Sequence, residues 1–453
     1  MTDNTGRTSS SAASSAPTAG TPMSRVEVPV TMHWVSSPLG MLLALPLPVL
    51  IGSLAIPSEQ FPPLFGQPSF LTDFTRGVAV LYLAIWLAIF VFAVPMRSVS
   101  TASISLDWRA QQWLHRSVRT IAIVTFGAYL TWGVIALARG LTIDAVRSLL
   151  AGDPGTMYVL RYQYFESLGG VTTWMQLGAL LAPLAILRAK ATGRSARAIL
   201  VWLFALALVR ALLNSERLAL IEITVSTLLA YLILRPAAPR ILRRWPTAIA
   251  LIAGGWLGLV ILFAGFEFFR SWTSAQATYE GGFWSYAVSL LLGYYATALN
   301  LAAFDINMLG GRPQLASLFD GNLYEQLFGP SAIAGAQRAY GLETFTNRSG
   351  LLSPLAALGL FGGALLFIAI GILLATLARR TARGDVVAFA TYCASAVGIL
   401  EIVRIFYFGS SRFAPVIIAA LVLWLSWGLS RAGPRSPHPP ATPDPPPDDH
   451  TSL

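Results

Sequence analysis

The residues best suited to chemistry in this sequence are charged side chains that interrupt or border its apolar runs. Glu216 and Arg217 lie in a short polar turn between two such runs. Glu401 and Arg404 are three residues apart, so they would share one face of a helix, and Arg412 follows soon after. Charged groups within a membrane are costly and usually functional. Because guanidinium groups bind phosphate oxygens without a metal, we expect an arginine-lined cavity that binds an anion. The alternative is that the charges only pair and hold helices together.

Further polar and aromatic residues border the same runs and are candidates for binding a substrate. Tyrosine rings beside polar groups suit the faces and edges of sugars, but tyrosine and tryptophan also anchor helices at a membrane interface. For Tyr294 and Tyr295 both interpretations stay open. The candidate substrate-binding residues are Arg161, Arg210, Arg270, Tyr294, Tyr295, Asn300, Asn347, Glu401 and Tyr407.

Several common catalytic motifs are missing from the sequence. It has no GxxxxGK[ST] phosphate loop, no HExxH zinc motif and no DxD motif for a metal-bound sugar nucleotide. Cys393 is the only cysteine, which leaves no cysteine-ligated metal site. All four histidines fall in segments that we predict to be cytoplasmic. We therefore expect no metal and no cofactor, and a carboxylate as the base of any external active site.

The composition indicates which elements hold these residues. Of the 453 residues, 55% are hydrophobic and only 11% are charged, against roughly 25% charged in soluble domains. The net charge of +10 comes mostly from arginines at the ends of apolar runs, so nucleic acid is not an expected partner. Runs of about 20 apolar residues can each cross a bilayer. They predict an all-α polytopic membrane protein with ten spans at about 39–56, 76–95, 118–138, 171–188, 197–214, 218–234, 247–266, 354–378, 386–406 and 413–430.

Basic connections give the expected orientation of these spans, because arginine and lysine collect on the cytoplasmic side of membrane helices. The short basic connections are 96–117, 188–197, 235–244 and 379–385. Both termini are then cytoplasmic, and 267–353 is a long external segment that begins and ends on one side. Its apolar run 283–304 cannot be a lone crossing, so we expect it to be re-entrant, to lie in the interface or to pair with an unrecognised crossing.

The two ends of the chain have a different composition from the apolar middle. Residues 1–34 are rich in Ser, Thr and Ala, and residues 432–453 in Pro and Asp. Such segments cannot bury enough apolar surface to fold. We expect disordered cytoplasmic tails on either side of a polytopic transmembrane domain at 35–431.

Four short stretches carry a resemblance to a known family. They are Leu212–Ala219 (LLNSERLA), Gly293-Tyr294-Tyr295 leading to Asn300, Phe345–Gly350 (FTNRSG) running into Gly359–Gly363 (GLFGG), and Arg404–Tyr407 (RIFY) with Ser411–Phe413 (SRF). In this order, and with a long external segment late in the chain, they resemble the oligosaccharide repeat-unit polymerases (O-antigen polymerase, Wzy-type) over about 35–430. The placement of the long segment is also similar to that in O-antigen ligases and in peptidoglycan polymerases of the shape and division class.

The resemblance implies a glycosyltransferase of the bacterial plasma membrane that works at the outer leaflet. In this family a growing glycan leaves undecaprenyl pyrophosphate and joins the next lipid-linked repeat unit with inversion. The residues implied to stabilise the departing pyrophosphate are Arg217, Arg270, Arg404 and Arg412. Those implied to take the proton of the acceptor hydroxyl are Glu216 first, then Glu401 and Glu166. The implied partners are polyprenyl-pyrophosphate-linked oligosaccharides, the lipid bilayer, and flippase and chain-length regulator proteins.

Two other functions are alternatives to this one. A flippase for lipid-linked oligosaccharides, or another transporter, would also bind pyrophosphate with arginine, but transporters often have paired halves with broken helices at matching positions. A glycosyltransferase using polyprenyl-phosphate sugars would be expected to have an acidic pair in its first external loop. That loop has only Glu59 and Asp73, far apart. The ligase relatives use a histidine in the external loop, which this chain lacks there.

Overall fold

The computed structural model describes most of the chain between the two tails. The described residues are 25–93, 101–151, 153, 156–166, 168–213, 217–235, 245–272, 275–276, 279–308, 313–319 and 347–432. The predictions for Glu216, for the side chain of Arg270 and for most of 309–346 therefore lie outside the described residues. So do the predictions for residues 1–24 and 433–453 of the two tails.

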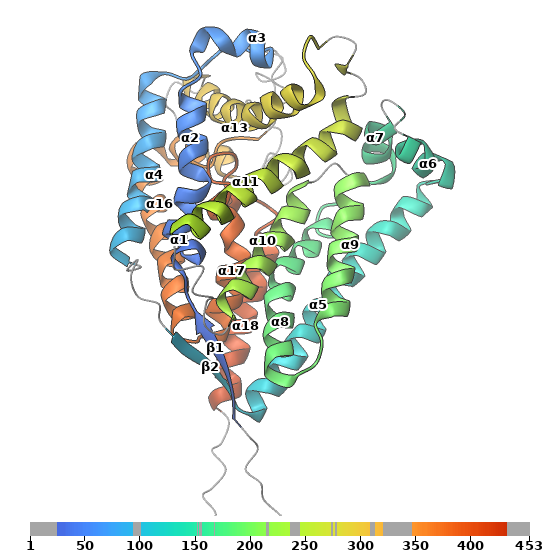
Figure 1. The fold of residues 1–453 in the computed structure, drawn as a ribbon, viewed down its shortest axis with the longest axis vertical. Coiled ribbons are helices and arrows are strands. Elements are labelled where there is room, and N and C mark those ends of the chain that lie inside the picture. The colour runs from blue at the N-terminus through green and yellow to red at the C-terminus, as the bar shows by residue number, and fades with distance from the viewer. Residues whose placement is uncertain are drawn as a thin grey trace, which may run out of the picture.

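Helices make up most of the described structure, and the longer ones run roughly alongside one another (Figure 1). In the first half, the α-helices are α1 (Pro38–Ala44), α2 (Pro46–Leu54), α3 (Phe61–Phe65), α4 (Asp73–Ala93), α5 (Trp108–Ala138), α6 (Ile143–Ala151), α7 (Thr156–Val159), α8 (Gly178–Thr192) and α9 (Arg197–Leu213). In the second half they are α10 (Arg217–Ile233), α11 (Trp245–Glu267), α13 (Phe283–Met308), α16 (Ser353–Ala382), α17 (Val386–Leu400) and α18 (Ala414–Ala432).

Short 3-10 and π segments connect several of these helices. The 3-10 segments are η1 (Trp34–Ser36), η2 (Ser58–Gln60), η4 (Thr172–Leu177), η7 (Leu315–Leu318) and η8 (Tyr407–Gly409). The π segments are η3 (Leu160–Tyr164) and η6 (Phe268–Trp272). Both π segments follow directly on an α-helix, so each prolongs the helix before it with a wider turn.

Within the described residues, every run predicted to cross the membrane contains α-helix, but not over its whole length: the run 386–406 is helical only to Leu400, with Glu401 and Arg404 in the turn that follows, and the run 171–188 begins with the 3-10 segment η4. Among the described residues, four helices are long and apolar enough to span a bilayer: Asp73–Ala93, Trp108–Ala138, Phe283–Met308 and Ser353–Ala382. The number rises to five if Pro38–Leu54 and Ser58–Phe65, which are bent by 89° relative to each other, form one span. The structure is therefore that of a largely helical protein with membrane-spanning helices. Ten spans, and the cytoplasmic position of both ends, stay predictions.

A small antiparallel sheet departs from the all-α prediction. Strand β1 (Val26–Thr31) pairs with β2 (Thr101–Leu106), with Val28 opposite Ile104 and Val26 opposite Leu106. Residues 26–31 had been assigned to the disordered tail on composition, but Val26, Val28 and Val30 alternate with more polar residues. Alternation of this kind places the apolar side chains of a strand on one face, and here Val28 and Val30 are buried. The sheet lies at the lower end of the bundle (Figure 1).

Close backbone contacts fix the long helix α16 against α4. A Cβ atom at Gly371 would collide with the side chains of Trp86 and Ile89, which are on α4. The Trp86 indole N–H donates to the carbonyl of Phe367 at 2.8 Å. At Gly359, where φ is +71°, the helical conformation of α16 is interrupted. Glycine adopts positive φ without steric cost, so this residue permits the break.

Helix α13, which contains the ambiguous run 283–304, crosses the upper end of the bundle at an angle to the long helices (Figure 1). Of the most apolar 18-residue stretch of this helix, 72% is buried within the protein. The Asn300 amide donates to the Pro68 carbonyl at 2.8 Å and accepts from the Phe70 N–H at 2.5 Å. Helix α13 is thus attached to the segment that precedes α4, and it is covered mainly by protein.

Candidate functional site

The candidate site forms where three helices end and α13 crosses them. Arg217 is the first residue of α10, Glu267 is the last of α11, and Glu401 follows the last turn of α17. Helix α17 begins near the sheet end of the bundle, since a Cβ at Gly384 would collide with the Ser103 carbonyl of β2. Fifteen helical residues extend about 22 Å, so the C-terminal end of α17 lies well away from the sheet. We call Arg217, Glu267, Tyr294, Glu401 and Arg404 the arginine–tyrosine cluster.

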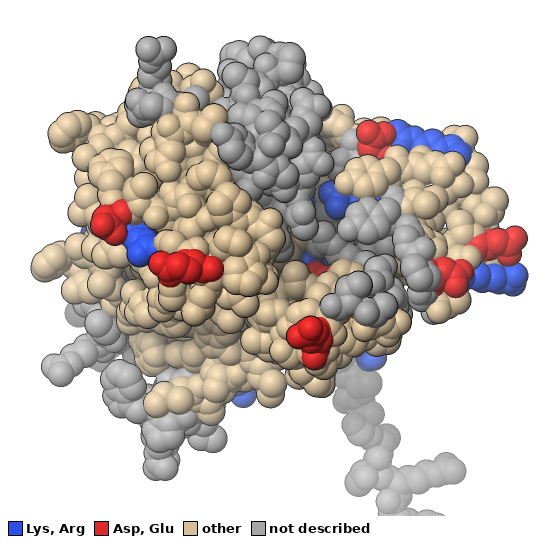
Figure 2. Space-filling model, turned by 90° about the horizontal axis from the view of Figure 1, so that it is seen from above, with Lys and Arg blue, Asp and Glu red and all other residues tan. Residues whose placement is uncertain are grey.

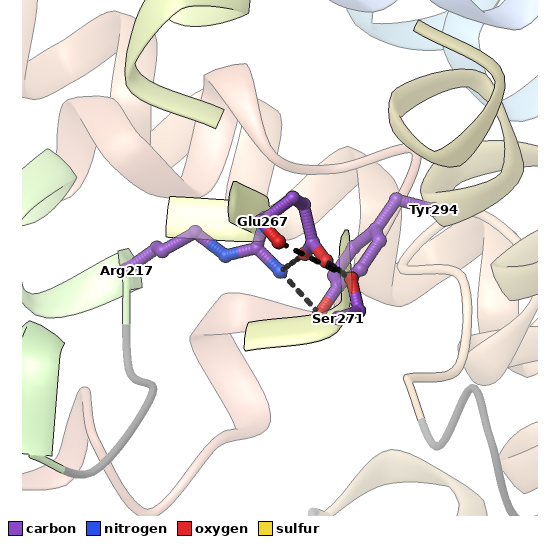
Figure 3. A network of polar contacts seen from close by, with 4 residues as sticks. All are labelled: Arg217, Glu267, Ser271 and Tyr294. Carbon is purple, nitrogen blue, oxygen red and sulfur yellow. Dashed lines mark hydrogen bonds and ion pairs between the residues drawn. The ribbon is translucent and has the colours of Figure 1, made fainter. Parts of the chain in front are cut away.

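The first half of the cluster is a buried ion pair. Arg217 Nη2 lies 2.6 Å from Glu267 Oε1, and the two side chains are only 9% and 3% exposed. Figure 3 shows these two residues meeting Ser271 and Tyr294. The Ser271 hydroxyl donates to Glu267, and Arg217 Nη2 also donates to the Tyr294 hydroxyl at 3.0 Å. Buried charges are stable only when paired and hydrogen-bonded, and this pair has both kinds of partner.

Tyr294 connects the two arginines of the cluster. The guanidinium carbon of Arg217 lies 4.8 Å from the centre of the Tyr294 ring, and that of Arg404 lies 5.5 Å from it. Arg217 also lies 4.2 Å from the ring centre of Phe263. Guanidinium groups within about 6 Å of a ring centre are attracted to the aromatic face. Two cations that are 187 positions apart in the sequence therefore converge on one tyrosine.

The second half of the cluster is formed by Glu401 and Arg404. Arg404 Nε lies 2.7 Å from Glu401 Oε2, and both side chains are largely buried. The neighbouring Tyr295 is buried and interacts electrostatically with Glu401, Arg404 and Arg217. The predicted pairing of Glu401 with Arg404, three residues apart, is present.

The turn that carries Arg404 is held by a close contact with the segment before α16. A Cβ at Gly350 would lie 2.5 Å from the Ile405 carbonyl oxygen and 2.6 Å from that of Ile402. The same segment is attached to α13, because the Ser349 N–H donates to the Ala298 carbonyl at 3.0 Å. Glycine at position 350 thus allows three segments, which are distant in the sequence, to meet beside Arg404.

A second ionic group lies further along α10. Arg412 Nη1 is 4.0 Å from Glu222 Oε1, and Glu222 is buried. The buried Tyr407 hydroxyl interacts electrostatically with both residues. Glu222 is five positions after Arg217 on α10, so this group starts about 7.5 Å along the helix from the first. Arg412 and Tyr407, which were predicted as site residues, therefore lie near the arginine–tyrosine cluster but not within it.

Three other predicted site residues make contacts of their own. Arg210 is buried in α9, and its Nη1 donates to the Thr172 carbonyl at 3.4 Å. Arg161 lies 5.3 Å from the ring centre of Tyr162, within η3. The oxygen and the nitrogen of the Asn300 side-chain amide both bind backbone, as described above.

The remaining predicted site residues are Asn347, Glu166 and Glu216. Asn347 is half-buried, just before the segment that contacts the turn of Arg404. Glu166, a candidate base, is mostly exposed and lies 3.6 Å from Arg139. Glu216 directly precedes Arg217 in the sequence but lies outside the described residues.

Three ion pairs were not predicted from the sequence: Arg217 with Glu267, Arg412 with Glu222, and Arg348 with Asp305. Glu267 had been used only to mark the end of a span, although a carboxylate at the end of an apolar helix is itself a signal. Asp305 is buried within α13, and its Oδ2 lies 2.5 Å from Arg348 Nε. Asp305 follows a long apolar run, so its cost of burial implied a cationic partner. The identity of that partner depends on the path of the chain between α13 and α16.

The surface around this end carries few charges. Seen from above, most of the described surface is uncharged, with acidic and basic side chains in small separate groups (Figure 2). The buried cluster thus differs from its surroundings in holding several charges close together. Among the described residues, no three His, Cys, Asp or Glu side chains are grouped as a metal site would require.

Comparisons with protein-family models, with curated proteins and with solved structures find no match to this chain. The function therefore has to be argued from the site itself.

Proposed function

We propose that this protein polymerises undecaprenyl-pyrophosphate-linked oligosaccharide repeat units into a surface polysaccharide. The reaction would be an inverting, metal-independent glycosyl transfer at the outer leaflet of the bacterial plasma membrane. One observation carries the proposal: Arg217 and Arg404, each next to a buried carboxylate, converge on the ring of Tyr294. The sequence resemblance points to the same chemistry.

The two arginines suit a reaction that expels pyrophosphate. As the bond between the anomeric carbon and the pyrophosphate oxygen breaks, negative charge develops on the leaving group. Preorganised cations in a site with little water stabilise such charge strongly. Nη1 of Arg217 is buried and has no hydrogen-bond partner among the described residues. This N–H group is therefore our first candidate donor to a pyrophosphate oxygen.

A carboxylate would accept the proton of the acceptor hydroxyl while that oxygen forms the new glycosidic bond. A general base must lie within hydrogen-bond reach of the proton that it takes. Glu401 and Glu267 border the two arginines, and Glu216 adjoins Arg217 in the sequence. We keep Glu216 as first choice and Glu401 as second, and we add Glu267 as a further candidate. Tyr295 and Tyr407 are buried, whereas Tyr294 is half-buried, so the ring of Tyr294 is the one that would pack against a sugar of the repeat unit.

The test is to delete the gene and analyse the lipid-linked and surface glycans on gels. We expect single repeat units on the outer leaflet and no long chains. The wild-type gene should restore long chains, and so should Arg147→Ala, a control at an exposed arginine of α6. The genes carrying Arg217→Ala, Arg404→Ala or Arg412→Ala should not, although the proteins should be inserted normally.

Two results would contradict the proposal. Repeat units trapped on the cytoplasmic side would mean that the protein is a flippase. Unchanged glycans would point to a transporter of another anion. Full chain length in all three arginine variants would remove the role of the arginine–tyrosine cluster, even if the deletion itself stopped polymerisation.

A further inference from the structure

A groove with basic side chains opens between α5, α8 and α9, at the end of the bundle that we predict to be cytoplasmic. It has a volume of about 510 Å³, and its lining includes His115, Arg119 and Phe126 from α5, Arg188 from α8 and Ile199 from α9. This groove is separate from the arginine–tyrosine cluster, because α9 begins at the basic α8–α9 turn and α10 begins at the other end of α9 with Arg217.

The two stretches of chain that form this groove carry basic but no acidic residues. The sequence contains no Asp or Glu in 108–126 or in 186–204, which are the stretches that form it. Arg188 interacts electrostatically with Arg194, which carries the same charge. The buried Nε of Arg188 has no hydrogen-bond partner within the described part of the chain. Like charges held together without a counter-ion favour an anion from outside the chain.

An apolar groove continues from the basic one between α5 and α9. It has a volume of about 700 Å³ and is lined by Phe126, Leu130 and Trp132 of α5 and by Trp202 and Leu206 of α9, among other apolar residues. Phe126 lines both grooves. Leu130 is 70% exposed and Trp202 is 62% exposed, so this groove opens towards the side of the bundle and hence towards lipid.

The distance between the basic and the apolar residues of α5 matches the distance between the phosphate and the acyl chains of a phospholipid. Phe126 is seven residues beyond Arg119, which is about 10 Å along the helix. Half of a bilayer's hydrocarbon core is about 15 Å thick. A phosphate at Arg119 would therefore place the acyl chain of the same lipid beside Phe126, Leu130 and Trp202. A soluble anion would use the basic groove but would leave the apolar one uncovered.

We propose that an anionic phospholipid of the cytoplasmic leaflet binds in this groove. Its phosphate contacts Arg119 and Arg188, and one acyl chain lies between α5 and α9. On the far side of α9, Lys190, Arg194 and Arg197 line another groove of about 770 Å³. These cations strengthen the positive potential at the site. Basic pockets between membrane helices on the cytoplasmic side are typical sites for anionic headgroups.

The experiment measures quenching of Trp202 fluorescence by brominated lipids in the full-length protein reconstituted in nanodiscs. The signal of Trp202 is the difference between the wild-type protein and Trp202→Phe. We expect brominated phosphatidylglycerol to quench it at a roughly 10- to 30-fold lower mole fraction than brominated phosphatidylcholine, since each arginine near an anionic lipid contributes about fivefold. In Arg119→Gln/Arg188→Gln the preference should disappear, so that the two lipids quench Trp202 at about the same mole fraction. The control Arg379→Gln/Arg383→Gln removes the same charge from another basic connection and should keep the preference.

Three results would overturn the proposal. Equal quenching by the two lipids in the wild-type protein would show that the groove does not select anionic headgroups, whether or not any variant folds. A preference that persists in Arg119→Gln/Arg188→Gln would place the selectivity elsewhere. Loss of the preference on adding millimolar inorganic phosphate, with no effect of the same concentration of chloride salt, would show that the site binds a soluble anion instead.

Discussion

Replacing Glu267 by alanine should destabilise the protein strongly, because Arg217 would keep its charge in a buried site. The Arg217 side chain is 9% exposed and lies 2.6 Å from Glu267. Its hydrogen bond to Tyr294 and its contacts with two rings exist with or without Glu267, so they do not compensate for the loss. Breaking a buried ion pair from one side costs about 3–5 kcal/mol. We expect a decrease of this size in the free energy of unfolding.

Arg217→Ala should cost a similar amount, since the buried carboxylate of Glu267 would then lose the cation that lies 2.6 Å from it. The double variant has neither charge. We therefore expect its decrease in the free energy of unfolding to be smaller than the sum of the two single decreases, by at least about 2 kcal/mol. The free energies would be measured by reversible unfolding in mixed micelles with increasing SDS, monitored by tryptophan fluorescence.

A cycle of the same kind at Arg147 and Asp144 provides the control. These side chains are 76% and 87% exposed and 3.4 Å apart, and exposed pairs contribute little. Its coupling should be close to zero. If the cycle at Arg217 and Glu267 is additive to within about 0.5 kcal/mol, the two charges are not coupled, and the description of a buried ion pair is wrong.

Three further predictions concern other contacts of the site. Gly350→Ala should lower stability by about 1–3 kcal/mol through overpacking and should reduce glycan chain length. Gly133→Ala is the control, because an added Cβ there meets no atom within 4 Å, and it should leave both properties intact or improve stability slightly. Equal thermal unfolding of the two variants would contradict the close contact at Gly350. Arg404→Lys should abolish long glycan chains on gels as completely as Arg404→Ala, because an ammonium group cannot form the paired contacts of a guanidinium. Glycans of normal length would show that the positive charge alone is sufficient. Asn300→Leu should reduce thermal stability, since an unpaired buried backbone group costs about 1–3 kcal/mol; unchanged stability with lost activity would instead indicate contact with the substrate.

The positions of the helices could be predicted from the sequence because the signal is local. Runs of about 20 apolar residues mark a membrane helix without reference to its neighbours. The predicted run 354–378 is thus found within α16, and the described part of the predicted run 76–95 lies within α4, which begins three residues earlier. The strand β1 was missed because its partner is some 70 residues away. Six residues with three valines are too short a signal when the pairing strand is unknown.

The site could be predicted only in part, for a related reason. Glu401 and Arg404 are neighbours on one turn, so their pairing followed from spacing. Arg217 and Arg404 were proposed to act together because each was costly to bury, not because their approach to Tyr294 was visible. Asn300 was assigned to substrate because a polar residue in an apolar run is conspicuous, but a polar group can equally serve to bind backbone. That distinction requires knowing that residues 68–70 lie beside α13.

The sheet of β1 and β2 has a consequence for the order in which the protein is assembled. Its two strands are paired and so lie on the same side of the membrane, and the chain from 32 to 100 must therefore cross the membrane an even number of times. Strand β1 is synthesised first, but it has no partner until Leu106 has been made and the helices between have been inserted. The sheet therefore closes only after the first helical hairpin is complete. Two cysteines engineered opposite each other on the strands and joined by an added thiol-reactive cross-linker would report, during synthesis, the moment at which that hairpin has entered the bilayer.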